Sequence, residues 1–320
     1  MFAKILKQAS QVVVMSMLAT SALAAEWPTR TVKIISNLPI GTLPDVVYRK
    51  TAELLSEKWQ QPVIVENRPG GGGLVALGEF EREGVKDDHL IFAPDTGVVA
   101  ILPIITPRKD MLKNIQPIGL SFVAEMWMIT SSKYTNEQAF EEFRKRPIFG
   151  SWAVGSIAHI CGLELTTALS SNPAEHVAYK EYGVWYTDLH NQAFPLSCSS
   201  YGSARAMIEG GKVRVIAVAA DKRDPKMPQV PTVREVTGQD VKFTASILGY
   251  FVHNNLDKKI ASKIERDLLE VSQSAEVKAV VERGHGTSLV LNSKDFARYL
   301  TVARTNLART TQKHQLKLDQ

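Results

Sequence analysis

Short apolar segments alternate with amphipathic segments along most of this chain, and this alternation constrains the fold more than any other feature. The order from residue 31 is an apolar run at 31–37, a helical pattern at about 45–59, an apolar run at 62–67, a helical pattern at 74–82 and an apolar run at 89–96. These patterns predict a βαβαβ unit with a parallel sheet that helices cover on both faces. In such a unit the strand-to-helix turns gather on one edge of the sheet.

A second unit of the same kind follows apolar strands at about residues 117–131. Thr135 and Gln138 have the spacing of a capping box and predict the start of a helix over 136–146. The remaining predicted elements are a strand at 147–153, a helix at 156–169, strands at 175–180 and 194–200, a helix at 201–211 and a strand at 213–220. A charged loop with three prolines precedes a strand at 243–253, and helices from about 257 and 293 complete the chain.

The first 24 residues have the pattern of an export signal. A basic segment with Lys4 and Lys7 precedes an apolar stretch of roughly a dozen residues and the small-residue site Ala22-Leu23-Ala24. An N-terminal membrane anchor is the alternative, but the apolar stretch is shorter than the ~20 residues that span a bilayer. We therefore expect cleavage after Ala24 and a mature protein in the periplasm.

The charge of the mature chain argues against nucleic-acid binding. Loss of residues 1–24 removes two of the 38 basic side chains and leaves 36 against 33 acidic ones, a net charge of +3. No basic run stands out for phosphate contacts.

Cys161 and Cys198 are the two cysteines of the chain, and their spacing fits no metal-binding or redox motif. An oxidising compartment permits a disulfide between them. We favour the alternative, in which both are buried free thiols.

The turn SNLPIGTLPDVVYR at residues 36–49 connects the first predicted strand to the first predicted helix. Thr42 precedes Asp45 by three residues, which is the pattern of a helix N-terminus, and Gly41 frees the backbone to turn sharply. Unpaired N–H groups at the positive end of the helix dipole could hold a carboxylate there. Pro44 lacks an N–H and removes one donor. The turn therefore either contacts a ligand or only reverses the chain.

Two further turns are rich in glycine. NRPGGGG at 67–73 lacks a following Gly-Lys-Ser/Thr, and Val75 breaks the dinucleotide fingerprint, so we expect a strained turn with close strand-to-helix packing. In GSWAVGSIAH at 150–159, Gly155 and Ser156 could expose backbone donors and a cap at the start of a helix. His159 is then either a ligand contact or a packing histidine. Two helix N-termini, one from each unit, should converge on a shared cleft.

Motifs of common catalytic classes are missing from the sequence. It contains no G-x-S-x-G elbow, no H-E-x-x-H and no Cys-His signature. A hydrolase would therefore need a catalytic triad assembled from residues that lie far apart in the sequence. We predict no enzyme, no cofactor and no metal site.

Taken together, these segments resemble a known family. The export signal, the turn with Pro39, Gly41, Asp45 and Arg49, and the segments QPVIVENRPGGGG, GSWAVGSIAH, VAYKEYGVWYTDL and PTVREV look like the solute receptors of tripartite tricarboxylate transporters, often called Bug-type proteins. The resemblance covers essentially the whole mature chain in the right order. QPVIVENRPGGGG carries its most specific marker.

The resemblance implies a type II periplasmic-binding-protein fold, an α/β architecture of two doubly wound domains joined by a two-strand hinge. Domain one would be residues 25–125 with 246–320, and domain two residues 126–245. Such receptors are expected to be monomers that capture a small organic carboxylate without a cofactor and deliver it to membrane permease subunits. The ligand contacts implied by the family's turns are Leu38, Pro39, Ile40, Gly41, Thr42, Asp45, Ala153, Val154, Gly155, Ser156, His159, Ser199 and Ser200.

The chain departs from the family pattern within these turns. Leu43 and Pro44 stiffen the first turn, bulky Trp185 and Tyr186 replace small residues, and Ser199 replaces a common acid. These differences imply an altered pocket. The alternative function is a ligand sensor or an interaction protein for a membrane partner, and a secreted hydrolase is a further alternative.

Overall fold

The strands predicted in the first unit form one side of a six-stranded sheet in the computed structural model, which describes residues 26–108 and 110–318. β1 (Val32–Ser36), β2 (Val63–Asn67) and β3 (Leu90–Phe92) run parallel. β10 (Ser246–His253) lies antiparallel between β3 and β4 (Ile115–Ala124), and β11 (Gly286–Asn292) pairs with the other edge of β4. The parallel sheet predicted for the βαβαβ unit is therefore confirmed for β1, β2 and β3, and the antiparallel strands β10 and β11 make the whole sheet mixed.

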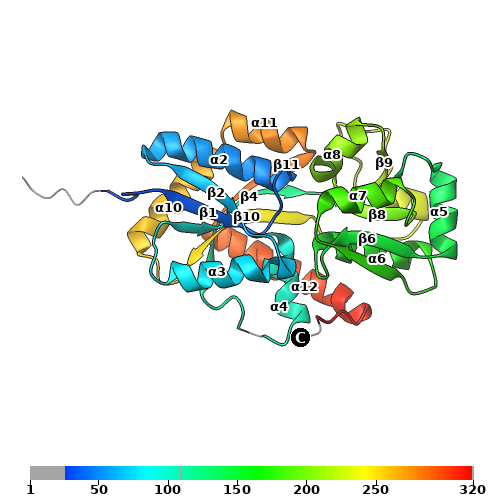
Figure 1. Cartoon of the computed structure of the whole chain (residues 1–320), viewed down its shortest axis with the longest axis horizontal. Helices are drawn as coiled ribbons and strands as arrows, with labels where there is room; N and C mark the ends of the chain where they lie inside the picture. The colour runs from blue at the N-terminus through cyan, green and yellow to red at the C-terminus, as the bar shows by residue number, and fades with distance from the viewer. Residues whose placement is uncertain (1–25, 109, 319–320) are drawn as a thin grey trace, which may run out of the picture.

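Helices cover both faces of this sheet and complete what we call the first lobe (Figure 1). One face carries α2 (Leu43–Trp59), α10 (Lys258–Ser272) and α11 (Ala275–Arg283). The other carries the short turn η1 (Gly71–Gly73), α3 (Leu74–Gly84), the π-helical η2 (Gly97–Ile101), α4 (Leu102–Ile105) and α12 (Ser293–Lys313). Adjacent residues of β1 point to opposite faces, so Ile34 enters one core and Ile35 the other.

The second lobe is built on a five-stranded sheet in the order β7-β6-β8-β5-β9. β6 (Ile148–Trp152) is parallel to β7 (Glu175–Tyr179) and β8 (Leu196–Ser200), whereas β5 (Met126–Ser131) is antiparallel to β8 and β9 (Val213–Ala219). Its helices are α5 (Asn136–Lys145), α6 (Ile157–Leu169), α7 (Tyr182–His190), α8 (Tyr201–Glu209) and α9 (Val233–Thr237). The predicted capping box of Thr135 and Gln138 at the start of α5 is confirmed.

The chain passes between the lobes twice. It crosses first at Glu125, between β4 and β5, and returns through residues 220–245 to β10. The C-terminal helix also reaches the second lobe, because the Thr310 hydroxyl of α12 donates a hydrogen bond to the Glu164 carboxylate of α6. The molecule therefore has the two-domain α/β architecture that the sequence predicts.

Cys161 of α6 and Cys198 of β8 form a disulfide, so the favoured expectation of two free thiols is wrong. The packing of α6 against β8 brings their Cα atoms to 6.0 Å. The two residues are 37 positions apart in the sequence. Their proximity comes from helix-on-strand packing, which the spacing alone does not encode.

Several elements were missed in the sequence analysis. Helix α7 follows β7 where only a connection was expected, and α11 and β11 fill the stretch between α10 and α12. The predicted export signal and its cleavage after Ala24 lie outside the described residues. Among the residues that are described, none of the helices combines the length and apolar character required to cross a membrane.

Candidate functional site

The first predicted turn, after β1, lies at the boundary between the lobes. Contrary to expectation, the Thr42 side chain makes no capping hydrogen bond to α2, and its hydroxyl donates to the carbonyl of Pro39 at 2.9 Å. Leu38 is buried beside this turn, whereas the Ile40 side chain is 75% exposed. The turn therefore presents one apolar side chain to the interior and another to solvent.

Asp45 holds the same turn from within. Its carboxylate accepts the Gly41 N–H at 2.9 Å and the Asn67 amide at 2.8 Å, and it forms an ion pair with Arg49 at 3.1 Å. The Gly41 φ of 83° is in the left-handed region that favours glycine. Because the carboxylate is buried and its oxygens are engaged within the turn, Asp45 shapes the backbone of the turn.

The second predicted turn leads from β6 into α6. Ser156 caps α6 by accepting the His159 N–H at 3.1 Å, as expected. The Gly155 N–H is not an open donor, because it donates to Nδ1 of His159 at 3.2 Å. Ala153 and Gly155 both have positive φ, so the chain reverses tightly here. The Val154 carbonyl approaches η1 of the first lobe, since a Cβ on Gly72 would lie 3.6 Å from it.

Ser199 and Ser200 end β8 at the same edge of the second sheet. The Ser199 hydroxyl lies 2.6 Å from the Tyr186 hydroxyl, and Ser200 caps α8 by accepting the Ser203 N–H. These hydroxyls face the start of α6 across a common space.

That space is a cavity of about 40 Å³ between the lobes, which the turns of both lobes reach. Its lining residues from the first lobe and the junction are Leu38, Pro44, Asp95, Ala124, Ser246 and Leu248. Those from the second lobe are Met126, Trp152, Ser156, Ile157, Ala158, Tyr182, Trp185, Ser199, Ser200 and Ser203. The volume has room for a water or two but not for a dicarboxylate.

Four of the thirteen predicted contacts line this cavity, namely Leu38, Ser156, Ser199 and Ser200. The other nine are not among the residues that line it: Pro39, Ile40, Gly41, Thr42, Asp45, Ala153, Val154, Gly155 and His159.

The sequence analysis missed Asp95, Trp152 and Tyr182 as lining residues, whereas it named Trp185 as a bulky residue that alters the pocket. Asp95 carried a usable signal, because an acid at the carboxyl end of a predicted parallel strand lies on the ligand edge of a sheet.

Asp95 is the acidic side chain of the lining set. Its Oδ1 accepts the Val98 N–H at 3.0 Å, and its own N–H donates to Asn37 Oδ1 at 2.9 Å. Burial raises the pKa of the Asp95 carboxyl to about 6, although the Val98 N–H opposes this shift. Burial also raises the pKa of Tyr182, and the nearby Asp95 carboxylate adds to that rise across the lobe boundary.

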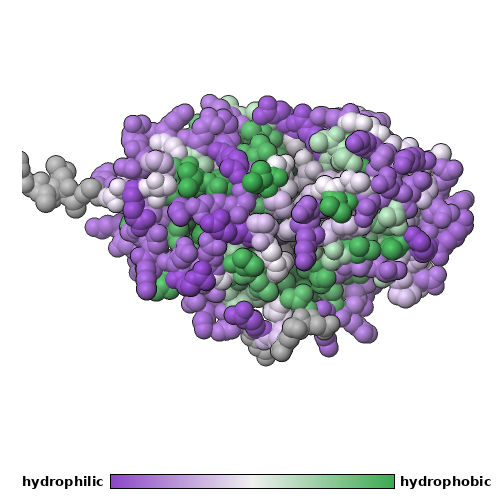
Figure 2. All heavy atoms as spheres, in the orientation of Figure 1, coloured by the Kyte–Doolittle hydropathy of each residue, from purple (hydrophilic) through white to green (hydrophobic). Residues whose placement is uncertain are grey.

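The lobes also touch beside the cavity. Gly202 of α8 donates its N–H to the carbonyl of Gly284, which follows α11, at 3.1 Å. Leu43, the first residue of α2, packs closely against both glycines. If Gly202 carried a Cβ, that atom would lie 2.8 Å from Leu43 Cβ, and a Cβ on Gly284 would lie 2.4 Å from Leu43 Cδ1. Figure 2 shows several small hydrophobic patches on this face near the line where the lobes meet.

His159 stacks on His176 behind the second turn, with ring centroids 3.7 Å apart. Because the Gly155 N–H donates to Nδ1 of His159, that nitrogen is an acceptor and the ring is neutral. Burial lowers the pKa of His159 to about 3, and the neighbouring His176 adds to this lowering. Burial likewise lowers the pKa of His176 to about 4. His159 therefore positions the turn, which matches the packing alternative.

We expect the contribution of His159 and His176 to the free energy of unfolding to fall as the pH drops from about 6.5 to 4, because unfolded histidines take up protons that the folded ones exclude. Their contribution is fully present above about pH 6.5. The raised pKa values of Asp95 and Glu125 act in the opposite direction over this range, so the test compares the wild type with a His159 variant. Protonation of His159 should not change the ligand affinity between about pH 5 and 8, because its pKa lies below this range. Thermal melts between about pH 6.5 and 4 should show that the melting temperature of His159→Asn changes less steeply with pH than that of the wild type. The asparagine amide oxygen can replace Nδ1 as the acceptor of the Gly155 N–H. Equal slopes in the two proteins would contradict this assignment.

Two larger hollows, of about 660 and 700 Å³, lie on the surface beside residues 239–245. Their charged rims contain exposed ion pairs, such as Lys242 with Asp221. Exposed pairs of this kind are common on protein surfaces and carry little energy. We place the candidate site in the smaller cavity, because the strand-to-helix turns of both lobes meet there.

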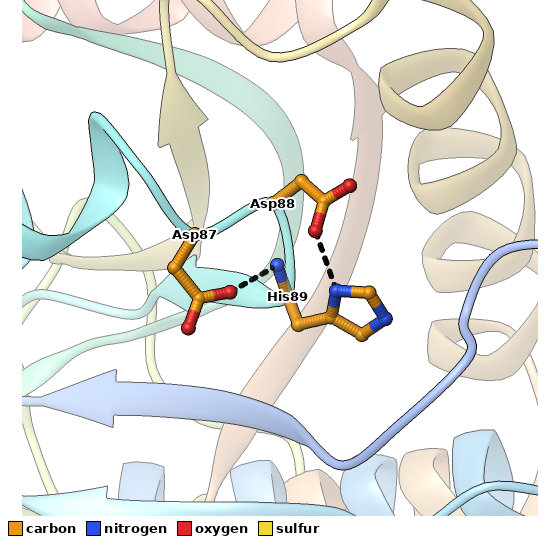
Figure 3. A group of neighbouring side chains, drawn as sticks. All are labelled: Asp87, Asp88 and His89. Atoms are coloured by element: carbon orange, nitrogen blue, oxygen red, sulfur yellow. Dashed lines mark hydrogen bonds and ion pairs between the residues drawn. The ribbon is translucent and has the colours of Figure 1, made fainter.

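Asp87, Asp88 and His89 form a separate cluster before β3 (Figure 3). Asp87 accepts the His89 N–H at 2.8 Å, and Arg30 pairs with Asp87 at 2.7 Å. The His89 ring accepts the Thr29 N–H through Nε2, so its Nδ1–H donates to Asp88 at 2.6 Å. With these groups engaged by the protein, the cluster anchors the segment that precedes β1.

Comparisons with known proteins add a family and a fold. The family model described as "Tripartite tricarboxylate transporter family receptor" matches residues 47–314. Protein BugT of Bordetella pertussis is 25% identical over 296 residues, which cover 88% of this chain and 89% of that protein. The solved structure of the periplasmic binding protein BugD has a TM-score of 0.81 at 21% identity and covers 91% of this chain and 99% of its own.

Two further solved structures share the fold. Rpa4515 of R. palustris, solved with adipate, has a TM-score of 0.82 at 18% identity and covers 91% of this chain and 99% of its own. MatC of Rhodopseudomonas palustris, solved with bound malate, has a TM-score of 0.77 at 18% identity and covers 89% of this chain and 99% of its own.

Proposed function

The chain belongs to the tripartite tricarboxylate transporter receptor family, and from this premise we propose that it captures a small carboxylate between its lobes and presents it to membrane permease subunits. The neighbours solved with adipate and malate support this class of ligand. The proposal places the mature protein in the periplasm as a monomer, after cleavage behind Ala24. It also divides the chain into domain one, 25–125 with 246–320, and domain two, 126–245.

The observation that carries the proposal is the interlobe cavity at the start of α6. Ile157 and Ala158, the first two residues of α6, line the cavity, and their N–H groups have no acceptor in the described part of the chain. These donors lie at the positive end of a 13-residue helix, where an anion is stabilised. The Ser203 hydroxyl, which accepts a hydrogen bond from Ser200 Oγ at 2.9 Å, supplies a further donor.

Ligand capture requires the lobes to separate and close again. The cavity of about 40 Å³ is smaller than a dicarboxylate. To admit a ligand, either the side chains of Leu38 and Trp185 must move aside or the lobes must close less tightly around it. Binding then favours the closed arrangement only by the difference in affinity between closed and open states.

A panel of organic acids tests the proposal by thermal shift on residues 25–320. A carboxylate that binds the folded state should raise the melting temperature, since ligand at 100 times its Kd adds about 2.7 kcal/mol to the free energy of unfolding. A melting curve that no acid moves would contradict solute capture. That result would favour the alternative of a sensor or interaction protein, in which the bulky side chains close the pocket permanently.

Replacing Gly155 with valine should weaken binding of the strongest acid from this panel about 10-fold more than replacing Gly72 with valine. Both glycines have positive φ, 76° and 61°, so both substitutions strain the backbone. A Cβ on Gly155 would also lie 2.8 Å from Ile105 Cδ1, whereas one on Gly72 meets nothing closer than 3.6 Å. Calorimetric titration of both variants measures the difference. Equal losses of affinity would contradict the role given to the second turn.

A further inference from the structure

We propose that Asp95 is a specificity residue that selects a ligand carrying a positively charged amino group beside its carboxylate. The inference rests on the proposed function, because it concerns the same cavity. It begins from a conflict of charge: a pocket expected to hold an anion contains a buried carboxylate of its own.

No basic side chain offsets this carboxylate. Of the described residues that line the cavity, none is lysine, arginine or histidine. Asp95 is 7% exposed and forms no ion pair within residues 26–108 and 110–318. A ligand with only negative groups would therefore bring like charges together in a site with little water to screen them. An ammonium group on the ligand removes that repulsion and provides the missing counter-charge.

The neighbourhood of Asp95 provides more acceptors and aromatic faces than cationic donors. A Cβ placed on Gly97 would lie 3.1 Å from the Gly155 carbonyl oxygen and 3.2 Å from Asp95 Oδ1, so acceptors of both lobes come close together there. The rings of Trp152 and Trp185 line the same cavity, with Tyr182 between them at centroid distances of 5.5 and 5.4 Å. A carboxylate with aromatic rings is a common setting for binding an ammonium group.

The two ends of the cavity then have opposite preferences. The N–H groups of Ile157 and Ala158 and the Ser203 hydroxyl favour the ligand carboxylate, whereas Asp95 on the first lobe favours the amino group. A zwitterion that spans them would contact both lobes. Burial raises the pKa of Asp95 to about 6, so the carboxyl is mostly ionised at pH 7 and can pair with the amino group.

A purely structural role of Asp95 makes a different prediction. Its Oδ1 accepts the Val98 N–H and so caps the start of η2. Asparagine caps a helix about as well as aspartate. Asp95→Asn therefore keeps the cap and removes the charge, which separates the two roles.

The experiment uses matched acids that differ by one amino group: succinate against aspartate, and glutarate against glutamate. Calorimetric titration of wild-type residues 25–320 should show that the amino member of the preferred pair binds about 10-fold or more tightly than its partner. In Asp95→Asn the amino member should lose about 30-fold or more in affinity, and the preference should disappear or reverse. Asp110→Asn, at an exposed site outside the cavity, controls for net charge.

Tighter wild-type binding of the unsubstituted acids, or an unchanged preference in Asp95→Asn, would overturn the inference and leave the proposed function standing. If none of the four acids nor any other carboxylate binds, the proposed function fails and this inference with it. The melting temperature of Asp95→Asn reports whether the cap is retained. Should that variant not fold, the preference of the wild-type protein within the matched pairs decides the question.

Discussion

Replacing Gly202 with alanine should weaken ligand binding by about 5- to 100-fold while leaving both lobes folded. The new Cβ would lie 2.8 Å from Leu43 Cβ and 3.0 Å from Gly284 Cα, and neither atom can swing away as the end of a flexible side chain can. Both contacts cross the lobe boundary, so the overlap exists only when the lobes are closed. The substitution therefore costs free energy in the closed state and none in the open state.

Gly183 provides a matched control for this variant. Gly202 is the second residue of α8 and Gly183 the second residue of α7, and a Cβ on Gly183 meets nothing within 4 Å. Gly183→Ala should bind as the wild type does. Small-angle scattering with the preferred acid should show a larger radius of gyration for Gly202→Ala than for the control. Full affinity in Gly202→Ala would mean that the Leu43 contacts do not belong to the ligand-bound state.

Removing the disulfide should lower the free energy of unfolding by about 2–4 kcal/mol, because the bridge restricts the unfolded chain over a long loop. Cys161 and Cys198 are 37 residues apart, which places the expected loss near the upper end of that range. The corresponding drop in melting temperature is roughly 3 to 6 °C for a chain of this length. Cys161 lies in the second turn of α6, and Cys198 directly precedes Ser199, so the bridge also ties together two walls of the cavity.

Thermal melts with and without a reductant measure this effect, and the double variant Cys161→Ala with Cys198→Ala supplies the control. The double variant should melt at the lower temperature and should not respond to the reductant. An equal melting temperature for the reduced and oxidised wild type would contradict the prediction.

Local patterns of the sequence predicted the elements that short-range physics controls. The Thr135 and Gln138 pair predicted the start of α5, because a capping box is complete within four residues. The glycine run at 70–73 predicted a strained turn, and all four glycines have positive φ. Thr42 stands at the N-cap position of α2 as predicted, but its side chain makes no capping hydrogen bond and its hydroxyl donates to the Pro39 carbonyl. Helix α7 was missed because its bulky residues gave no clear helical period.

The candidate site could be predicted only in part. The alternation of strands and helices placed both turns on the ligand edge, since connectivity and strand direction determine where such turns lie. Which side chains reach the cavity was decided by the packing of one lobe on the other. That packing brings Asp95 of the first lobe opposite Tyr182 of the second, whereas the hydrogen bond between Gly155 and His159 is local to the second turn.

The order of elements, the capping box and the family motifs are properties of neighbouring residues, so the sequence by itself determined the two-domain α/β fold and its receptor family. The disulfide, the small cavity and the closed contact of Leu43 with two glycines join residues far apart in the chain. Only the tertiary structure decided these features, because they depend on distances across helix, sheet and lobe boundaries that no local spacing specifies.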